Sequence, residues 1–290
     1  MVILAGLGTA IDGRLDLLSH FRAHLGLALI GAALVFLLLK APVRGALSGV
    51  AGCAALATLV PVLWLNAAKP TGGDPMLRIL HFNMLGENRR ADEIATLIRA
   101  EEPDVVFLLE GTPMEPHFEA LSDLYPYRLP CQWAVNRCDL QVLSRLPLDE
   151  AELQPMPHSG NRVAMLPFTL GGQEITVVGA HFSKPYQDGV LWWQLHHMAD
   201  RLAAIETPLV LVGDFNATPW SKLLVDFKEK AGFRYVAGFR GSWPAEAGPL
   251  GFPIDHALVR GRAVPTDIAM LADDFGSNHR GFILGIAITP

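Results

Sequence analysis

The stretch that decides the fold is Leu209-Val210-Leu211-Val212-Gly213-Asp214-Phe215-Asn216-Ala217-Thr218-Pro219. Its apolar half is typical of a short buried strand, and Gly213 marks the end of that strand. In an open α/β sheet, ligands bind at the carboxyl ends of the strands. Because side chains alternate along an extended chain, Asp214 and Asn216 should lie on the same side. Their carboxylate and carboxamide suit a hydrated metal, an attacking water or a phosphate oxygen, although an Asx turn that caps the strand would use the same two residues.

Polar residues follow other predicted strands in the same way. Strands are predicted over 77–83 and 105–109, with a helix over 91–100 between them, and the two strand ends carry Asn83 and Glu110. A strand–helix–strand order is typical of an α/β fold and delivers both side chains to one edge of the sheet. Further polar residues stand at or just beyond predicted strands, and they are Arg145, His181, Asp255, Asn278 and His279. We therefore expect one polar cleft at the strand ends.

The first 68 residues differ in composition from the rest. The 24 positions from 45 to 68 carry no charge, and neither do the 15 positions from Leu25 to Leu39. A helix needs about 20 apolar residues to cross a bilayer. We predict a membrane anchor over residues 1–68, with apolar helices at about 24–39 and 45–66 and a third, shorter apolar piece at Met1–Ile11. A buried hairpin of a soluble protein is the alternative, and it is disfavoured because neither long run has a polar face.

Composition changes again after the anchor. Residues 69–75 are rich in Pro and Gly and predict a linker, and residues 76–290 indicate one soluble α/β domain. The formal charge is −6 for the whole chain and −8 for residues 75–290. Neutralisation of phosphates supplies most of the affinity for nucleic acids. The acidic domain therefore disfavours a long nucleic acid as substrate.

Charge and cysteine placement bear on the cellular compartment. Lys40 and Arg44 flank the short loop between the two long apolar runs, which favours a cytoplasmic loop and a domain in the periplasm, outside the bacterial inner membrane. Two arginines on the other side of the first long run oppose this orientation. Cys131 and Cys138 are close in sequence and would pair in an oxidising compartment, although two free thiols fit the spacing as well.

In their order along the chain, the motifs resemble the endonuclease/exonuclease/phosphatase superfamily, which has the DNase I-like fold. The matching pieces are His81-Phe82-Asn83, Leu108-Leu109-Glu110, Leu143-Ser144-Arg145, Gly179-Ala180-His181, Gly213-Asp214-Phe215-Asn216, Ile254-Asp255-His256 and Ser277-Asn278-His279-Arg280. The resemblance covers roughly Leu77 to Ile288. It implies a four-layer α/β sandwich, in which two packed mixed β-sheets are flanked by helices. The apolar N-terminus and the Asp16–Arg22 segment look like the membrane-anchored bacterial branch, in which case Met1–Ile11 is the truncated end of a further helix.

The resemblance also implies a role for each polar residue. Phosphoryl transfer depends on charge neutralisation and in-line positioning. Glu110 and Asn83 would hold Mg²⁺, or alternatively Mn²⁺, with Asn278 beside them. His279 would be the general base for the attacking water and would be oriented by Asp255. The other residues would position the water and the phosphate, and they are Asp214, Asn216, His181 and Arg145.

One position departs from the pattern of the superfamily. The usual Ser-Asp-His is replaced here by Ser277-Asn278-His279. That aspartate is often an additional metal ligand in the superfamily, so Asn278 removes a negative charge from the metal site. We expect weaker metal affinity or a site for a single metal, with Glu110 contributing more of the binding.

The sequence therefore predicts a membrane-anchored, Mg²⁺-dependent phosphoesterase that hydrolyses a phosphodiester or a phosphomonoester by direct attack of an activated water. The acidic domain and the tether favour a lipid headgroup or a small phosphorylated molecule as substrate, and no protein partner can be inferred. An extracytoplasmic nuclease is the alternative within this class. A non-catalytic binding module on the same fold is the alternative outside it, supported by Asn278 alone. A transporter is disfavoured because the apolar runs hold no ionisable residue.

Overall fold

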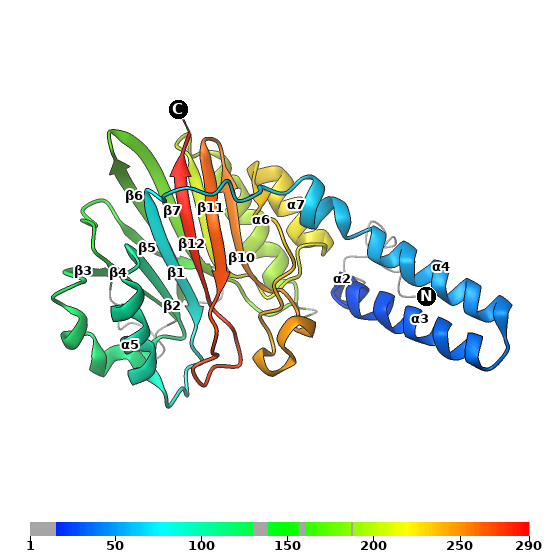
Figure 1. The fold of residues 1–290 in the computed structure, drawn as a ribbon. Coiled ribbons are helices and arrows are strands. Elements are labelled where there is room, and N and C mark those ends of the chain that lie inside the picture. Colours follow the sequence, from blue (N-terminus) through cyan, green and yellow to red (C-terminus); the bar gives the residue numbers. More distant parts are fainter. Residues whose placement is uncertain (1–15, 130–138, 157–159, 187, 290) are drawn as a thin grey trace.

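Two six-stranded mixed β-sheets pack face to face in the body of the molecule, and helices cover their outer faces (Figure 1). The computed structural model describes residues 16–129, 139–156, 160–186 and 188–289. The predicted four-layer α/β sandwich is confirmed. The predicted pairing of Cys131 with Cys138 and the apolar piece Met1–Ile11 lie outside the described residues.

The first sheet has the strand order β11-β12-β1-β2-β4-β3. Its strands are β1 (Leu77–Asn83), β2 (Val105–Leu109), β3 (Tyr127–Leu129), β4 (Leu140–Ser144), β11 (Ala263–Met270) and β12 (Phe282–Ile288). β1 and β2 are parallel, whereas β12 is antiparallel to β1 and β4 is antiparallel to β2. The carboxyl ends of β1 and β2 therefore share one edge with the amino ends of β4 and β12.

The second sheet has the order β5-β6-β7-β8-β10-β9. Its strands are β5 (Glu152–Met156), β6 (Gly160–Leu170), β7 (Gln173–His181), β8 (Leu209–Asp214), β9 (Arg234–Tyr235) and β10 (Asp255–Arg260). β7 and β8 are parallel, and β10 runs antiparallel to β8 so that Asp255 pairs with Asp214. The carboxyl ends of β7 and β8 thus meet the amino end of β10.

Alternation along the strands builds three apolar layers. In β8, Val210 and Val212 face the core between the sheets, while Leu209 and Leu211 pack with the helices outside. The outer face of the second sheet is covered by α6 (Val190–Ala203) and α7 (Lys222–Ala231). The outer face of the first sheet is covered by α5 (Ala91–Glu101), η3 (Thr112–His117) and η4 (Glu119–Leu121). Because both faces of the central strands are buried, their sequences are continuous apolar runs.

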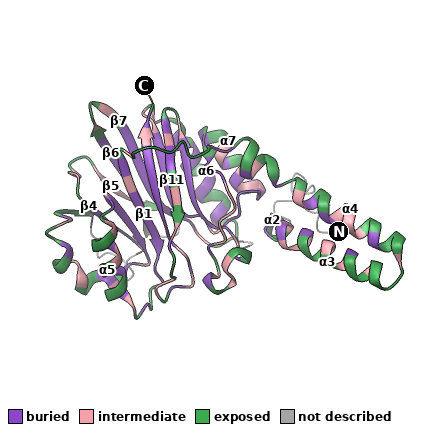
Figure 2. Cartoon of the chain, viewed as in Figure 1, coloured by how far each residue is buried: buried purple, intermediate pink, exposed green. Residues whose placement is uncertain are grey.

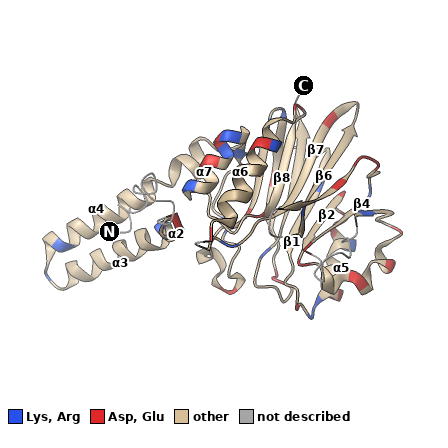
Figure 3. Ribbon diagram, turned by 180° about the vertical axis from the view of Figure 1, so that it is seen from behind, with Lys and Arg blue, Asp and Glu red and all other residues tan. Residues whose placement is uncertain are grey.

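A helical hairpin projects from one side of the sandwich (Figure 1). Its elements are α2 (Asp16–Ser19), α3 (Arg22–Leu38), α4 (Pro42–Ala57) and η2 (Pro61–Leu65). Most of its surface is exposed, in contrast to the buried strands (Figure 2), and charged residues are confined to its ends (Figure 3). Pro42–Leu65 is long and apolar enough to cross a membrane, whereas Arg22–Leu38 is a shorter apolar helix.

Small residues bring the two hairpin helices together. A Cβ atom on Gly52 would lie 2.8 Å from the backbone oxygen of Gly26, so the backbones approach closely at this point. Ser48 Oγ donates a hydrogen bond to the carbonyl of Leu29 at 2.7 Å. Small residues at the contact and an apolar outer surface are typical of helices that pair within a membrane. The anchor itself stays a prediction.

The segment predicted as a linker lies on the sandwich. Ala68 donates to the carbonyl of Tyr235 and accepts from the amide of Ala237, both at 2.8 Å. The amides of Thr71 and Gly72 donate to β11 carbonyls at 2.9 Å. Backbone bonds along 68–72 therefore tie the hairpin to both sheets.

Candidate active site

Strand ends from both sheets meet at one edge of the sandwich. The first sheet contributes Asn83 at the end of β1, and Glu110 directly after β2. The second sheet contributes His181 and Asp214 at the paired ends of β7 and β8. His279 lies three residues before β12, whose first residue pairs with His81 in β1. The predicted polar cleft at the strand ends corresponds to this edge.

A carboxylate between two imidazoles links the sheets. Asp255 accepts a hydrogen bond from His279 Nδ1 at 2.8 Å and another from His81 Nε2 at 3.0 Å. All three side chains are buried. Since Nδ1 of His279 is committed to Asp255, Nε2 points to Asp214, whose Oδ2 is 3.8 Å away. Asp255 therefore fixes both the tautomer and the orientation of His279.

Asn83 links two carboxylates at the same edge of the sandwich, Asp214 and Glu110. Its Nδ2 donates to Asp214 Oδ2 at 3.1 Å and to Glu110 Oε1 at 3.4 Å. The second oxygen of Glu110 accepts from the Gly86 amide at 2.9 Å. Glu110 adopts a left-handed backbone with φ of 52°, an uncommon conformation for a non-glycine residue that turns the chain sharply after β2.

The turn after β8 is held by its own side chains. The Asn216 amide N–H donates to Asp214 Oδ1 at 2.8 Å, as in an Asx turn. Asn216 Nδ2 donates to the carbonyl of Phe182 at 2.9 Å, and the Asn216 backbone is left-handed with φ of 49°. Asp214 and Asn216 therefore form an Asx turn, and this turn fixes the orientation of the Asp214 carboxylate.

A second charged pair lies beside His181, and reasoning from the sequence missed it. Arg162 Nε donates to Asp139 Oδ2 at 2.7 Å. Asp139 Oδ1 is 3.9 Å from Nδ1 of His181, whose Nε2 is 3.7 Å from Asp214. Asp139 precedes β4 and Arg162 lies within β6, so neither residue follows a strand, and no local pattern in the sequence marks either of them. His81 belongs to a quoted motif, but it had no role assigned.

Arg145 lies far from this cluster, whereas Asn278 adjoins His279. Arg145 is at the opposite end of the sheet, because β4 runs antiparallel to β2 and pairs Ser144 with Val105. Its guanidinium contacts Glu102, with 3.3 Å to Oε2, so the expectation that Arg145 joins the cleft is wrong. Asn278 precedes His279, is half-buried, and accepts a hydrogen bond from the Ala245 amide through its carbonyl at 2.8 Å.

Burial and neighbouring charges shift the pKa values in the cleft. Burial and the Asp255 carboxylate raise the pKa of Asp214 to about 7. Burial alone would lower the pKa of His279, but Asp255 and Asp214 outweigh it and raise that pKa to about 9. Burial opposes ionisation of Asp255, yet His279 and His81 hold its pKa well below the usual range. Burial and nearby cationic groups lower the pKa of His181 well below its ordinary value.

The donor set fits a hard divalent cation. Asp214, Asp255 and His279 each place one potential ligand atom within 4.8 Å of the others. Asp255 and His279 are already hydrogen-bonded to each other. The carboxylates of Asp214 and Glu110, which Asn83 links, are therefore the negative charges that a cation would neutralise. Mg²⁺ prefers one or two carboxylates together with retained waters. Burial and the Asp255 carboxylate raise the pKa of Asp214, and a bound cation would oppose this shift.

A buried histidine–carboxylate pair lies beside a cluster of acidic oxygens at the strand ends of an α/β sandwich, and this arrangement suits the hydrolysis of a phosphate ester. A profile of the Endonuclease/Exonuclease/phosphatase family matches residues 80–279, and the chain belongs to this family. The predicted family and enzyme class are thereby confirmed. No curated protein sequence matches the chain significantly.

Solved structures share the fold at low sequence identity. An endonuclease/exonuclease/phosphatase from Beutenbergia cavernae DSM 12333 has a TM-score of 0.60 and 20% identity, over 73% of this chain and 71% of that one. TDP2 from D. rerio, complexed with a single-strand DNA product, has a TM-score of 0.59 and 18% identity, over 73% and 98%. A variant beta toxin from Staphylococcus aureus with bound magnesium ions has a TM-score of 0.55 and 15% identity, over 72% and 99%.

Proposed function

We propose that this chain is a membrane-anchored, Mg²⁺-dependent phosphoesterase that cleaves a phosphodiester or a phosphomonoester by direct attack of water. The observation that carries the proposal is the His279–Asp255 pair, in which Nε2 of His279 lies 3.8 Å from Oδ2 of Asp214, the carboxylate that Asn83 links to Glu110. The exposed apolar hairpin favours a lipid headgroup, or a small phosphorylated molecule near the bilayer, as substrate. The inner membrane and a periplasmic domain are the location that we propose.

Each residue of the site has a separate role in the proposed reaction. Nε2 of His279 takes the proton of the attacking water, with Asp214 beside it to share the charge. Asp214 and Glu110 help to raise the pKa of His279, so a cation bound to these carboxylates would lower that pKa and free the imidazole to act as a base. Asn216 holds the turn that aims Asp214. A bound Mg²⁺, held by Glu110 and Asn83 with Asn278 beside them, would polarise a phosphoryl oxygen and stabilise the leaving oxygen.

His181 and Arg162 would contact the phosphate oxygens of the substrate. His181 is buried next to Asp214, and the Arg162 guanidinium lies behind it on Asp139. Arginine suits phosphate because its planar donors match the oxygens in pairs. We assign to Arg162 the phosphate contact that the sequence pattern placed at Arg145.

A direct test uses the full chain in detergent with a bis-aryl phosphodiester, first with Mg²⁺ or Mn²⁺ and then with a chelator. Metal-dependent turnover that the chelator abolishes supports the proposal. Binding of inorganic phosphate without turnover would instead favour a non-catalytic module. Vesicles of phospholipid and single-stranded DNA, offered in parallel, separate a lipid phosphoesterase from a nuclease. A steep loss of DNA binding with added salt would support the nuclease.

Replacing Arg162 by alanine should raise KM about tenfold to 100-fold, because a hydrogen bond to a charged group contributes about 1.5–3 kcal/mol. Steady-state kinetics on the diester measures the change. Arg145→Ala is the matched control, since Arg145 is bonded to Glu102 at the far end of the sheet. Equal effects of the two substitutions, or no effect at Arg162, would contradict the assignment.

The acid–base pair predicts a pH dependence with a defined sign. Activity should rise with pH as the His279–Asp214 pair loses its proton, because only the unprotonated pair accepts one from water. The Asp255 carboxylate raises the pKa of both groups. Asp255→Asn should therefore move the rising limb of the kcat profile to lower pH, at a reduced maximal rate. A limb that keeps its midpoint would assign the titration to another group.

A further inference from the structure

We infer that the segment Asp16–His24, which leads into the apolar helix α3, is a positioning element of the cleft, with His20 as the residue that holds the turn after β8. The inference rests on the proposed phosphoesterase function for its kinetic readout. It assigns a role to the Asp16–Arg22 sequence, which the proposed function leaves unused. The hairpin would then support the geometry of the site in addition to tethering the domain.

Asp16 caps a helix far away in the sequence. Its Oδ1 accepts from the Lys222 amide at 2.7 Å, and its Oδ2 accepts from the Leu223 amide at 3.1 Å, in the first turn of α7. Ser19 Oγ donates to the same carboxylate at 2.8 Å. Asp16 is 2% exposed. A buried carboxylate at a helix N-terminus is stabilised by the free amides and by the helix dipole.

His20 reaches the turn that carries Asp214 and Asn216. The Thr218 amide donates to His20 Nδ1 at 3.1 Å, and the Thr218 hydroxyl is 3.2 Å from the same nitrogen. His20 is buried, and its Nδ1 accepts from a backbone N–H, which requires the tautomer with hydrogen on Nε2. Trp220 Nε1 donates to the Ser19 carbonyl at 2.8 Å. The turn is therefore hydrogen-bonded to the N-terminal segment through His20 and Ser19.

The inner side of the same turn is bonded to the sandwich. His256 Nε2 donates to the carbonyl of Ala217 at 2.7 Å, and His256 follows Asp255 in β10. Residues 214–220 thus lie between a histidine of the domain and a histidine of the N-terminal segment. Without His20, only one of these two supports would remain, and the Thr218 amide would be left unpaired in the interior.

The same segment also touches the loop that leads to Asp255 and that is hydrogen-bonded to the residue after His279. The centroid of the Phe252 ring lies 5.2 Å from that of the Phe21 ring and 4.4 Å from that of the His24 ring. Within this loop, Ser242 Oγ accepts from the Asp255 amide at 3.1 Å. The Ser242 carbonyl accepts from the amide of Arg280, next to His279, at 2.9 Å. The segment therefore contacts both pieces of chain that position the acid–base groups.

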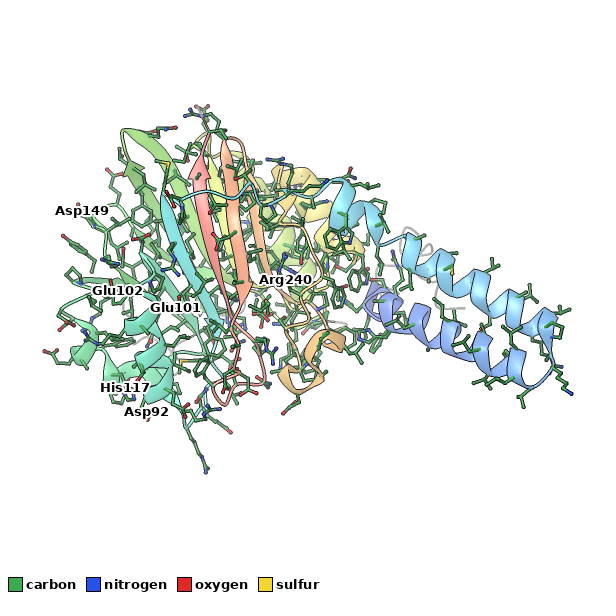
Figure 4. All side chains as sticks on the ribbon, in the orientation of Figure 1. Asp92, Glu101, Glu102, His117, Asp149 and Arg240 are labelled. Carbon is green, nitrogen blue, oxygen red and sulfur yellow. The ribbon has the colours of Figure 1, made fainter. Side chains whose placement is uncertain are left out.

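The far end of the hairpin returns to the same face. The Leu63 carbonyl accepts from the Gly238 amide at 3.1 Å. One apolar cluster joins residues from both ends of the hairpin to the domain, and its buried members are Ala23, Leu59, Leu63, Trp220 and Tyr235. Arg240, labelled in Figure 4 between the sheets and the hairpin, lies over the Tyr235 ring at 5.2 Å. Both ends of the hairpin therefore pack on the part of the domain that carries the turn after β8.

The test compares His20→Leu with His20→Asn in the full chain. Leucine fills the space but removes the acceptor, so kcat should fall about tenfold, within the range that a displaced catalytic group costs, while KM changes less than about twofold. Asparagine supplies Oδ1 where the ring had Nδ1 and should restore kcat to within about threefold of the wild type. Ser48→Ala, which removes a hydrogen bond inside the hairpin, is the matched control and should leave kcat unchanged.

Hydrogen exchange supplies a readout that needs no turnover. In His20→Leu, the amides of residues 214–220 should exchange faster, while those of the central strands β1 and β2 keep their protection. Faster exchange throughout the chain, or an unchanged kcat in His20→Leu, would overturn the inference and leave the segment with a role in stability alone. An inactive wild type with locally faster exchange in His20→Leu would refute the proposed function but support the positioning role.

Discussion

Alanine in place of His279 is expected to lower kcat by about 10³-fold, with little change in KM. His279 Nε2 faces Asp214 because Nδ1 is bonded to Asp255, so alanine removes the group that accepts the proton of water. General base catalysis contributes roughly 10²–10⁴-fold, and the central part of that range applies to a base held on both sides. Steady-state kinetics with the diester substrate and Mg²⁺ measures the loss.

The matched control for this substitution is His197→Ala. His197 is exposed on α6, on the outer face of the second sheet, and stacks on Trp193 with 5.1 Å between ring centroids. Its loss removes an imidazole without touching the strand ends, so activity should stay within about twofold. A His279→Ala enzyme with wild-type kcat would remove His279 from the mechanism and leave Asp214 as the base. Equal activity of both variants with and without metal would indicate a contaminating enzyme.

The residues at the ends of the parallel strands are the part of this site that the sequence predicts. Asn83, Glu110, His181 and Asp214 meet in the structure because their strands are pairwise parallel, and parallel strands bring their carboxyl ends to one edge. Arg145 follows its strand in the same way, but β4 runs in the opposite direction, so the same local pattern leads to the opposite edge. Strand direction depends on contacts between distant segments, and no local pattern encodes it.

Arg162 and the N-terminal segment take their places through contacts between residues that are far apart in the sequence. Arg162 lies within β6, and it joins the cleft only because Asp139, from the other sheet, binds its guanidinium. The composition of residues 69–75 predicts a linker, and that of residues 1–68 predicts a membrane anchor. The contacts of Asp16 and His20 with residues about 200 positions away are visible only in the folded chain.

Glutamine in place of Glu110 is expected to raise the Mg²⁺ concentration for half-maximal activity by at least about 10–100-fold, since even groups outside the first coordination shell cost this much when lost. Glutamine keeps an oxygen that can accept from the Gly86 amide, so the turn after β2 is retained while the charge is lost. Metal titrations of activity, and of Mn²⁺ binding followed by electron paramagnetic resonance, measure the shift. Glu102→Gln, next to Arg145 at the far end of the sheet, is the matched control.

Asn278→Asp tests the same charge argument in the opposite direction. Asn278 is half-buried and adjoins His279, so an aspartate there would add a carboxylate beside the cleft. The added charge should lower the Mg²⁺ concentration for half-maximal activity, because Mg²⁺ binds through one or two carboxylates and retained waters. Opposite shifts in Glu110→Gln and Asn278→Asp would locate the metal between the two residues. A metal requirement that neither substitution changes would place the ion on Asp214 alone and exclude Glu110 as its ligand.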